Sequence, residues 1–293
     1  MAALNRNGIY SALLSPLDSQ GGLNKEKLKA LVQYEMAHGA EGFYCCGSSG
    51  EGLLMETHER KAVAEIVAEE VGDRLPFIVH TGALSTRTAI ELSSHAKECG
   101  AAAVSLIPPI YYRYTIEEIE QYYIDVLDAV DIGIIVYNIP QFTGISFSKK
   151  NVFLTDKRII GIKHTSMNLY DLERLKQAFP DKILFSGFDE IFLSSLTAGA
   201  DASIGITVNI FPKLFIAIRK EFQNENISAA RDLQRVMNNF IEVITSAGVF
   251  SATKYCLTLQ GIDVGLFRKP FAPLTEEGKK QVREGLKEVE AWL

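Results

Sequence analysis

Residues 103–137 read AVSLIPPIYYRYTIEEIEQYYIDVLDAVDIGIIVY, and this stretch decides the fold. It begins with a short apolar run at 103–107 and ends with another at 133–137. Between the two runs, Thr115 and Glu118 have the spacing of a helix capping box, and apolar residues recur with helical periodicity. The stretch therefore predicts a strand, an amphipathic helix and a second strand, which is the repeating unit of a parallel sheet.

The same unit recurs along most of the chain. Apolar runs of strand length lie at 8–14, 42–46, 77–81, 103–107, 133–137, 159–163, 183–186 and 202–205. Helical segments between them start near Asn24, Thr57, Ser85, Thr115, Asn168, Asp189 and Pro212. Eight such units favour a closed (β/α)8 TIM barrel over the alternative, a doubly wound open sheet. The loop Gly47-Ser48-Ser49-Gly50-Glu51-Gly52 fits neither of the phosphate-binding patterns that would support an open sheet.

The alternation of strands and helices stops at residue 226. From there, residues 227–247, 251–260 and 275–293 have the pattern of helices. We therefore expect a barrel over residues 1–225 and a C-terminal helical extension over residues 226–293. No flexible linker separates the two parts, so the extension should pack on the barrel.

Composition and charge exclude several classes of function. The 293 residues include 36 acidic and 30 basic side chains, for a net charge of -6, which disfavours nucleic acid as a partner. No apolar run has the ~18 residues of a membrane span or the form of a signal peptide. The four cysteines lie in no metal-ligand spacing. These features predict a cytoplasmic protein with reduced thiols, which binds neither membranes nor a metal.

Lys163 closes the apolar run at 159–163. The site of a barrel enzyme lies where the strands end, and a lysine buried there loses hydration, which lowers its pKa. Such an amine can attack a ketone and form a Schiff base. The alternative is a lysine that begins a loop and pairs with a carboxylate.

Tyr137 ends the preceding strand of the predicted barrel. Its phenol would lie beside the lysine and could transfer protons. A core or rim tyrosine is the alternative, because aromatic residues often end strands.

Two loops carry further polar groups. Ser48 and Ser49 lie between glycines, and their hydroxyls and backbone amides could bind a small carboxylate; the alternative is a tight turn with a serine as helix cap. Asp189 and Glu190 could accept hydrogen bonds from a polyol or act as acid and base, although acidic residues also open helices for electrostatic reasons alone.

The ordered set of motifs resembles one superfamily over nearly the whole chain. The motifs are Gly47-Ser48-Ser49-Gly50-Glu51, Tyr111-Tyr112, Tyr137-Asn138-Ile139-Pro140, Gly161-Ile162-Lys163, Gly187-Phe188-Asp189-Glu190-Ile191-Phe192, Gly199-Ala200-Asp201 and Arg268-Lys269-Pro270-Phe271. They are similar to those of the pyruvate-dependent class I aldolases, which include the sialic acid lyases and the dihydrodipicolinate synthases.

The resemblance implies roles for individual residues. Lys163 would form the Schiff base, Tyr137 would transfer protons, and Ser48 with Ser49 would hold the pyruvate carboxylate. The residues that would contact the sugar-derived chain are Thr165, Gly187, Asp189 and Glu190. Tyr111 matches a tyrosine that in relatives completes the proton relay, often across a subunit interface, and the expected assembly is a homotetramer. Because the lysine supplies the electron sink, no cofactor is required.

Within the superfamily, a few side chains favour the sialic acid lyases. Dihydrodipicolinate synthases usually carry an arginine where this chain has Gln141-Phe142-Thr143-Gly144, whereas the string from Gly187 to Phe192 is similar to the sialic acid lyases. This implies reversible cleavage of N-acetylneuraminate to N-acetylmannosamine and pyruvate. However, Ile206 follows Gly205 where sialic acid lyases generally have a serine. The alternatives are therefore a dihydrodipicolinate synthase, another 2-keto-3-deoxy sugar acid aldolase, or a pyruvate-binding protein without activity.

Overall fold

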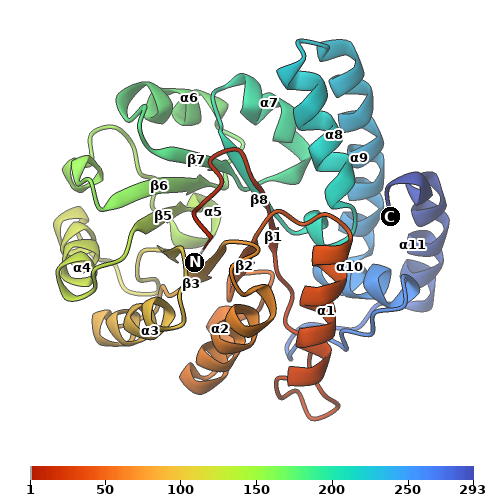
Figure 1. The fold of residues 1–293 in the computed structure, drawn as a ribbon, viewed down its shortest axis with the longest axis horizontal. Coiled ribbons are helices and arrows are strands. Elements are labelled where there is room, and N and C mark those ends of the chain that lie inside the picture. Colours follow the sequence, from red (N-terminus) through yellow and green to blue (C-terminus); the bar gives the residue numbers. More distant parts are fainter. Residues whose placement is uncertain (1) are drawn as a thin grey trace.

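Eight parallel strands form a closed ring in the computed structural model, which describes residues 2–293 (Figure 1). Each strand pairs with the next in the chain, and β8 pairs with β1, which closes the ring. The strands are β1 (Ile9–Ala12), β2 (Phe43–Cys45), β3 (Phe77–His80), β4 (Ala103–Leu106), β5 (Ile134–Asn138), β6 (Ile159–His164), β7 (Ile183–Ser186) and β8 (Ala202–Gly205). The predicted barrel is confirmed, and the open sheet is excluded.

Helices follow the strands and surround the ring. They are α1 (Lys25–Ala37), α2 (Thr57–Val71), α3 (Thr86–Glu98), α4 (Ile116–Ala129), α5 (Pro140–Thr143), α6 (Leu169–Ala178), α7 (Phe192–Thr197) and α8 (Pro212–Gln223). Side chains at the expected caps Asn24, Ser85, Thr115 and Asn168 accept backbone hydrogen bonds, and Thr115 forms the predicted capping box with Glu118. These caps satisfy amide groups that the first helical turn leaves free.

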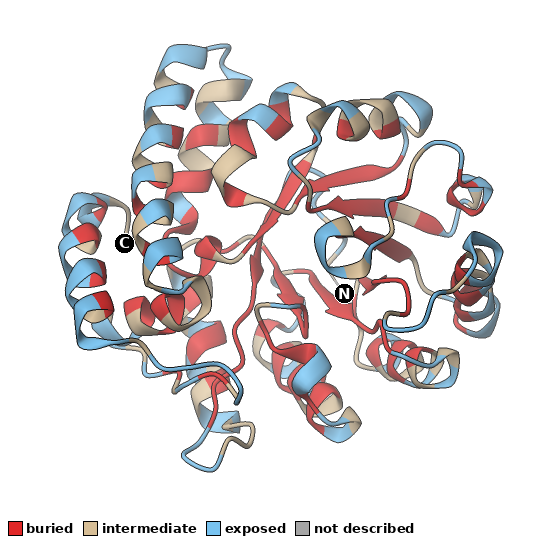
Figure 2. Cartoon of the chain, turned by 180° about the vertical axis from the view of Figure 1, so that it is seen from behind, coloured by how far each residue is buried: buried red, intermediate tan, exposed pale blue. Residues whose placement is uncertain are grey.

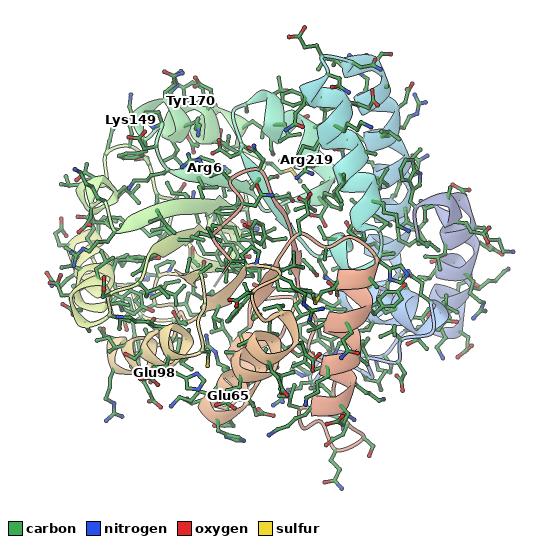
Figure 3. All side chains as sticks on the ribbon, viewed as in Figure 1. Arg6, Glu65, Glu98, Lys149, Tyr170 and Arg219 are labelled. Carbon is green, nitrogen blue, oxygen red and sulfur yellow. The ribbon has the colours of Figure 1, made fainter. Side chains whose placement is uncertain are left out.

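Apolar side chains fill the molecule in two layers. Inside the ring, Tyr10, Tyr44 and Phe185 are among the side chains that pack against one another. Outside the ring, the strands and the inner faces of the helices form a second layer, which Figure 2 shows as a buried centre within exposed outer faces. Charged side chains such as Glu65 and Glu98 lie on the outer surface (Figure 3). With the interior filled, the barrel leaves space for a ligand at its rim.

Three more helices follow the barrel on one side of the molecule (Figure 1). They are α9 (Ile227–Ala247), α10 (Val249–Leu259) and α11 (Glu276–Glu288), close to the predicted ranges. Phe240 of α9 packs in one apolar cluster with Phe211, which immediately precedes α8, and Phe215, which lies in the first turn of α8. The division into a barrel over 1–225 and an extension over 226–293 stays a prediction.

Among residues 2–293, no helix is both long and apolar enough to cross a membrane. The same residues contain no group of three or more His, Cys, Asp or Glu side chains that could hold a metal ion.

Glu35 of α1 should make the stability depend on pH. Its side chain is 1% exposed, and burial raises its pKa to about 8. The folded state therefore holds this proton more tightly than the unfolded state does. The stabilisation is complete at low pH and is lost as pH rises from the ordinary carboxyl pKa to about 8, at ~1.4 kcal/mol per pH unit.

We expect Glu35→Gln to remove this pH dependence, because the amide has nearly the same shape and does not ionise. Urea unfolding of both proteins at about pH 5, 6.5 and 8 measures the effect. The variant should gain stability relative to the parent protein as pH rises. Parallel stability curves would show that Glu35 does not titrate in this range.

Candidate active site

Lys163 lies near the end of β6, directly beside Tyr137 of β5 in the strand register. Its Nζ is 4.2 Å from the ring centroid of Tyr137 and 4.2 Å from that of Tyr44. The side chain is buried, and burial lowers the pKa of the amine; Tyr137 and then Asp189 act in the opposite direction. The alternative interpretation expected the lysine to begin a surface loop, but Lys163 lies within β6 and is buried. It is a desolvated amine with the properties of a nucleophile.

Tyr137 belongs to a group of aromatic side chains inside the ring. Its ring makes edge contacts with the rings of Tyr44 and His80, at centroid distances of 6.2 and 6.0 Å. Burial, with the charges of Arg60 and Lys163, holds the pKa of His80 well below its usual range, so this imidazole is neutral. The Tyr137 side chain nevertheless lines a cavity, so it is both a core residue and a residue of the candidate site.

The loop after β2 approaches the amine from another side. Ser48 is exposed and Ser49 is half-buried, and both line the same cavity as Lys163. The short 3-10 turn that follows (Gly52–Leu54) has Glu51 at its N-cap position, with no side-chain cap bond. Neither serine therefore caps this turn. Both remain available to a ligand.

Close packing explains two of the glycines in this loop. A Cβ on Gly47 would lie 2.5 Å from an atom of the Tyr44 ring, and one on Gly52 would lie 1.8 Å from the carbonyl oxygen of Cys46. Cys46 and Glu51 adopt positive φ angles of 58° and 59°, which cost energy in residues other than glycine. The loop must therefore be held in place by contacts elsewhere.

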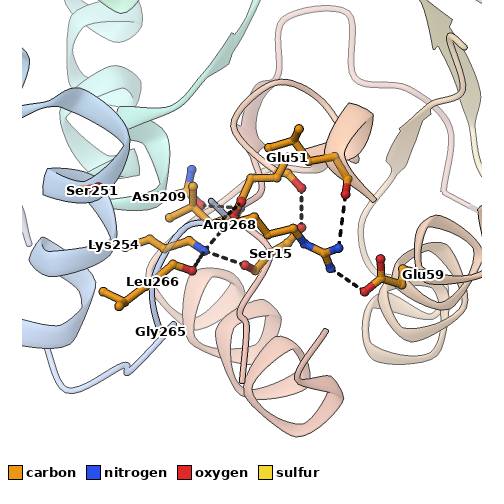
Figure 4. A network of polar contacts seen from close by, with 12 residues as sticks. Ser15, Glu51, Glu59, Asn209, Ser251, Lys254, Gly265, Leu266 and Arg268 are labelled. Carbon is orange, nitrogen blue, oxygen red and sulfur yellow. Dashed lines mark hydrogen bonds and ion pairs between the residues drawn. The ribbon is translucent and has the colours of Figure 1, made fainter. Parts of the chain in front are cut away.

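Glu51 provides those contacts through a buried ion pair (Figure 4). Its Oε1 lies 3.0 Å from Nζ of Lys254 in α10, and its Oε2 accepts a 2.6 Å hydrogen bond from the Arg268 backbone amide. Lys254 also donates to the carbonyl oxygens of Ser15 and Leu266, at 2.8 and 2.9 Å. Three segments that are distant in sequence thus converge on this loop.

Asp189 also lines this cavity. Its Oδ2 accepts hydrogen bonds of 2.8 Å from both the backbone amide and the hydroxyl of Thr207. Its Oδ1 has no protein partner among the described residues, and neither has the buried Oγ1 of Thr165. Burial raises the pKa of Asp189 to about 6. Polar oxygens without protein partners could bind ligand hydroxyls, which fits the predicted polyol contacts. The alternative from the sequence also holds, because acidic residues begin the 3-10 turn Asp189–Ile191.

Two glycines allow this arrangement. A Cβ on Gly187 would lie 1.9 Å from Thr165 Oγ1, and one on Gly205 would lie 2.0 Å from Asp189 Oδ1. Each glycine therefore lets the backbone pack closely against a buried polar oxygen, where a larger residue would clash.

A cavity of about 290 Å³ brings most of the predicted site residues together. It is lined by Ser48, Ser49, Tyr137, Lys163, Thr165, Gly187, Asp189, Glu190 and Ile206. Its apolar wall includes Phe142, Ile206, Ile241, Ile244, Val249 and Phe250. Gly205 is outside this lining but lies against Asp189.

Tyr111 is the predicted site residue that the structure places apart. Its side chain is 89% exposed, it contacts Tyr112 edge to face, and its φ is 84°. It does not line the cavity of Lys163. The predicted role across a subunit interface therefore stays a prediction.

Sequence reasoning missed two features of the site. Tyr44 lies inside the apolar run at 42–46, and the pattern does not distinguish it from a core residue. Lys254 lies within a helical segment 203 residues from Glu51, and no local signal pairs them. The one signal in the sequence that Tyr44 could belong to the site is its position three residues before Gly47.

The model of the dihydrodipicolinate synthetase family matches residues 5–289. The chain belongs to this family. Its members include a relative from Rhizobium meliloti, named N-acetylneuraminate lyase, that is 37% identical over 97% of this chain and 96% of the relative. Family membership confirms the resemblance from the motifs.

Solved structures share the fold end to end. A Clostridium difficile protein, CdNal, crystallised with mannosamine, has a TM-score of 0.94 and 33% identity, covering 99% of this chain and 100% of that chain. A catalytic lysine mutant of a Ruminococcus gnavus sialic acid aldolase has a TM-score of 0.94 and 28% identity, covering 100% of both chains.

We expect Lys254→Met to destabilise this family member by ~3–5 kcal/mol, because it leaves the Glu51 carboxylate buried without its cation. Combining it with Glu51→Gln removes that charge and should restore part of the loss. Urea unfolding measures both effects. If the single variant were as stable as the parent protein, the ion pair would not hold the loop.

Proposed function

We propose that this protein cleaves N-acetylneuraminate reversibly to N-acetylmannosamine and pyruvate through a Schiff base on Lys163. The observation that carries the proposal is a buried amine beside a tyrosine, between a loop of hydroxyls and a pair of unpartnered polar oxygens. The names of the relatives, a lyase and an aldolase of sialic acid, support the same carbon–carbon lyase activity.

The pyruvate half of the substrate fits the loop and the lysine. Ser48 and Ser49 would hold the C1 carboxylate with hydroxyls and backbone amides, which places C2 toward the amine. Lys163 then attacks the C2 ketone, and water leaves to give a protonated imine. Tyr137 would transfer the protons of these steps, since its ring lies against the amine.

The sugar half fits the opposite side of the cavity. Tyr137 would take the proton of the C4 hydroxyl as the C3–C4 bond breaks, assisted by the substrate carboxylate or Thr165. The electron pair of that bond moves toward the imine nitrogen. Asp189, Glu190 and the Thr165 hydroxyl would accept hydrogen bonds from the open-chain sugar. Protonation of the enamine and hydrolysis release pyruvate.

One observation favours a second candidate, another 2-keto-3-deoxy sugar acid aldolase. Ile206 belongs to an apolar wall, so this part of the cavity offers no hydrogen bond to a polar tail. A dihydrodipicolinate synthase is less well supported, because Gln141 and Phe142 line the cavity where a cation would pair with the second carboxylate. The pyruvate-binding protein without activity is disfavoured by the presence of both lysine and tyrosine in the cavity.

The assembly and the location belong to the same proposal. A homotetramer in the cytoplasm would place Tyr111 near a neighbouring subunit, where its exposed ring could complete a site. The Schiff base itself supplies the electron sink, so the proposed reaction uses no cofactor.

Lys163 is the residue on which the proposed Schiff base depends. Purified protein incubated with N-acetylneuraminate should release pyruvate, read by coupled lactate dehydrogenase, and pyruvate with borohydride should label Lys163 by mass spectrometry. Lys163→Ala should abolish both signals, because it removes the nucleophile. EDTA should change neither.

Three outcomes separate the alternatives. Labelling without sialic acid cleavage would keep the class I aldolase and direct attention to other aldehyde acceptors. An unlabelled protein would refute the Schiff base. Loss of activity with EDTA, restored by a divalent ion, would contradict the class I mechanism.

Tyr137 is the residue to which we assign proton transfer. Tyr137→Phe should retain the trapped pyruvate adduct but slow turnover about 10²–10⁴-fold, because the ring remains and the proton-transfer group is lost. Steady-state rates and intact-mass labelling of the same preparation measure the two effects. Unchanged turnover would exclude Tyr137 from the proton relay.

A further inference from the structure

Tyr44 lies against the reacting nitrogen, although no sequence motif includes it. Its ring centroid is 4.2 Å from Lys163 Nζ, the same distance as that of Tyr137. The two rings meet edge to face, with an interplanar angle of 87°. The amine is therefore in contact with two aromatic π systems inside a buried site.

Several contacts fix the Tyr44 ring in place. Its hydroxyl donates a 3.0 Å hydrogen bond to Oγ of Ser105 on β4, and its side chain is fully buried. Gly47 lies so close to the ring that a Cβ there would come within 2.5 Å. The ring therefore packs against both the amine and Gly47, and it has little freedom to move away from either.

The chemistry of a Schiff base gives this position a use. When the amine adds to a ketone, a C–N bond forms, the former ketone oxygen leaves as water, and the nitrogen becomes a positively charged iminium. In a buried site this charge lacks hydration. The negative face of an aromatic ring attracts such a cation.

We propose that Tyr44 is a further catalytic residue, whose ring forms with Tyr137 an aromatic cage that stabilises the iminium on Lys163. The proposal rests on the Schiff base proposed above. The cage favours the charged adduct over both the neutral carbinolamine and free pyruvate. Its effect should therefore appear in the amount of adduct at equilibrium, independently of the aldehyde that the enzyme accepts.

Fluorinated phenylalanines at position 44 test the cage. Fluorine withdraws electron density from the ring face while the ring keeps nearly its shape, so packing is preserved and cation attraction is lost. The measured quantity is the pyruvate concentration at which half of Lys163 is labelled in the presence of borohydride. For Tyr44→Phe this concentration should lie within about twofold of the value for the parent protein. That concentration should then rise progressively, by about tenfold at trifluorophenylalanine. Tyr44→Leu should give a loss of similar size.

A second series covers the case in which loss of the hydroxyl prevents folding. Fluorotyrosines at position 44 retain the bond to Ser105, and the same rise with fluorination is expected. The matched control is Tyr123, a fully buried tyrosine whose hydroxyl donates to the carbonyl oxygen of Leu106. The same replacements at Tyr123 should leave labelling unchanged.

The outcomes separate the cage from the reaction itself. Labelling that stays constant across the fluorinated series at position 44 would overturn the cage while leaving the Schiff base intact. Equal changes at positions 44 and 123 would also overturn it, since they would indicate a general packing effect. If the parent protein is not labelled at Lys163, the proposed function fails first.

Discussion

Burial of the Lys163 nitrogen is the constraint on which the rest of the site depends. An ammonium group in an apolar interior is unfavourable, and each unit by which its pKa falls corresponds to ~1.4 kcal/mol between its two forms. The filled interior of the barrel produces this burial. The register of β5 and β6 then places Tyr137 beside the amine, while β2 brings Tyr44 to it. The lowered pKa of this amine is thus a consequence of how the barrel packs, obtained at some cost in stability.

The C-terminal helices are part of the site as well as of the fold. The cavity is lined by residues of α9, at positions 241, 244 and 245, and of α10, at positions 249 and 250. Lys254 of α10 holds Glu51, and through it the loop that carries the serines. The strained backbone of that loop is therefore maintained by a buried charge pair between distant segments (Figure 4). Removal of the extension would expose the cavity and release the loop.

The lining of the cavity is polar in some parts and apolar in others, and this difference bears on the choice of aldehyde. Around Asp189 and Thr165, buried oxygens without protein partners favour a ligand with hydroxyl groups. Around Ile206, apolar side chains favour a part of the ligand that makes no hydrogen bonds. The part of the cavity proposed to bind pyruvate lacks this ambiguity, since the amine, the phenol and the serine loop all suit a 2-keto acid. Differences in the aldehyde can therefore arise from the residues around Asp189, Thr165 and Ile206, without change at the amine.

The sequence by itself determined the elements and their order. Apolar periodicity and caps such as the pair Thr115 and Glu118 depend on neighbouring residues, so the eight strands and most helix starts could be predicted. Lys163 and Tyr137 could be named as candidates because active-site residues of a barrel lie where strands end, and the structure places both in one cavity.

The tertiary structure alone decided which side chains meet across the ring. Tyr44 contacts the amine and Glu51 pairs with Lys254, although these residues are distant in sequence. Tyr111, in contrast, lies exposed and away from the cavity. A hydrophobic pattern specifies that a residue is buried, but not against which residue. Contacts of that kind follow from closing the barrel and packing its interior, where space is shared by strands from every part of the chain.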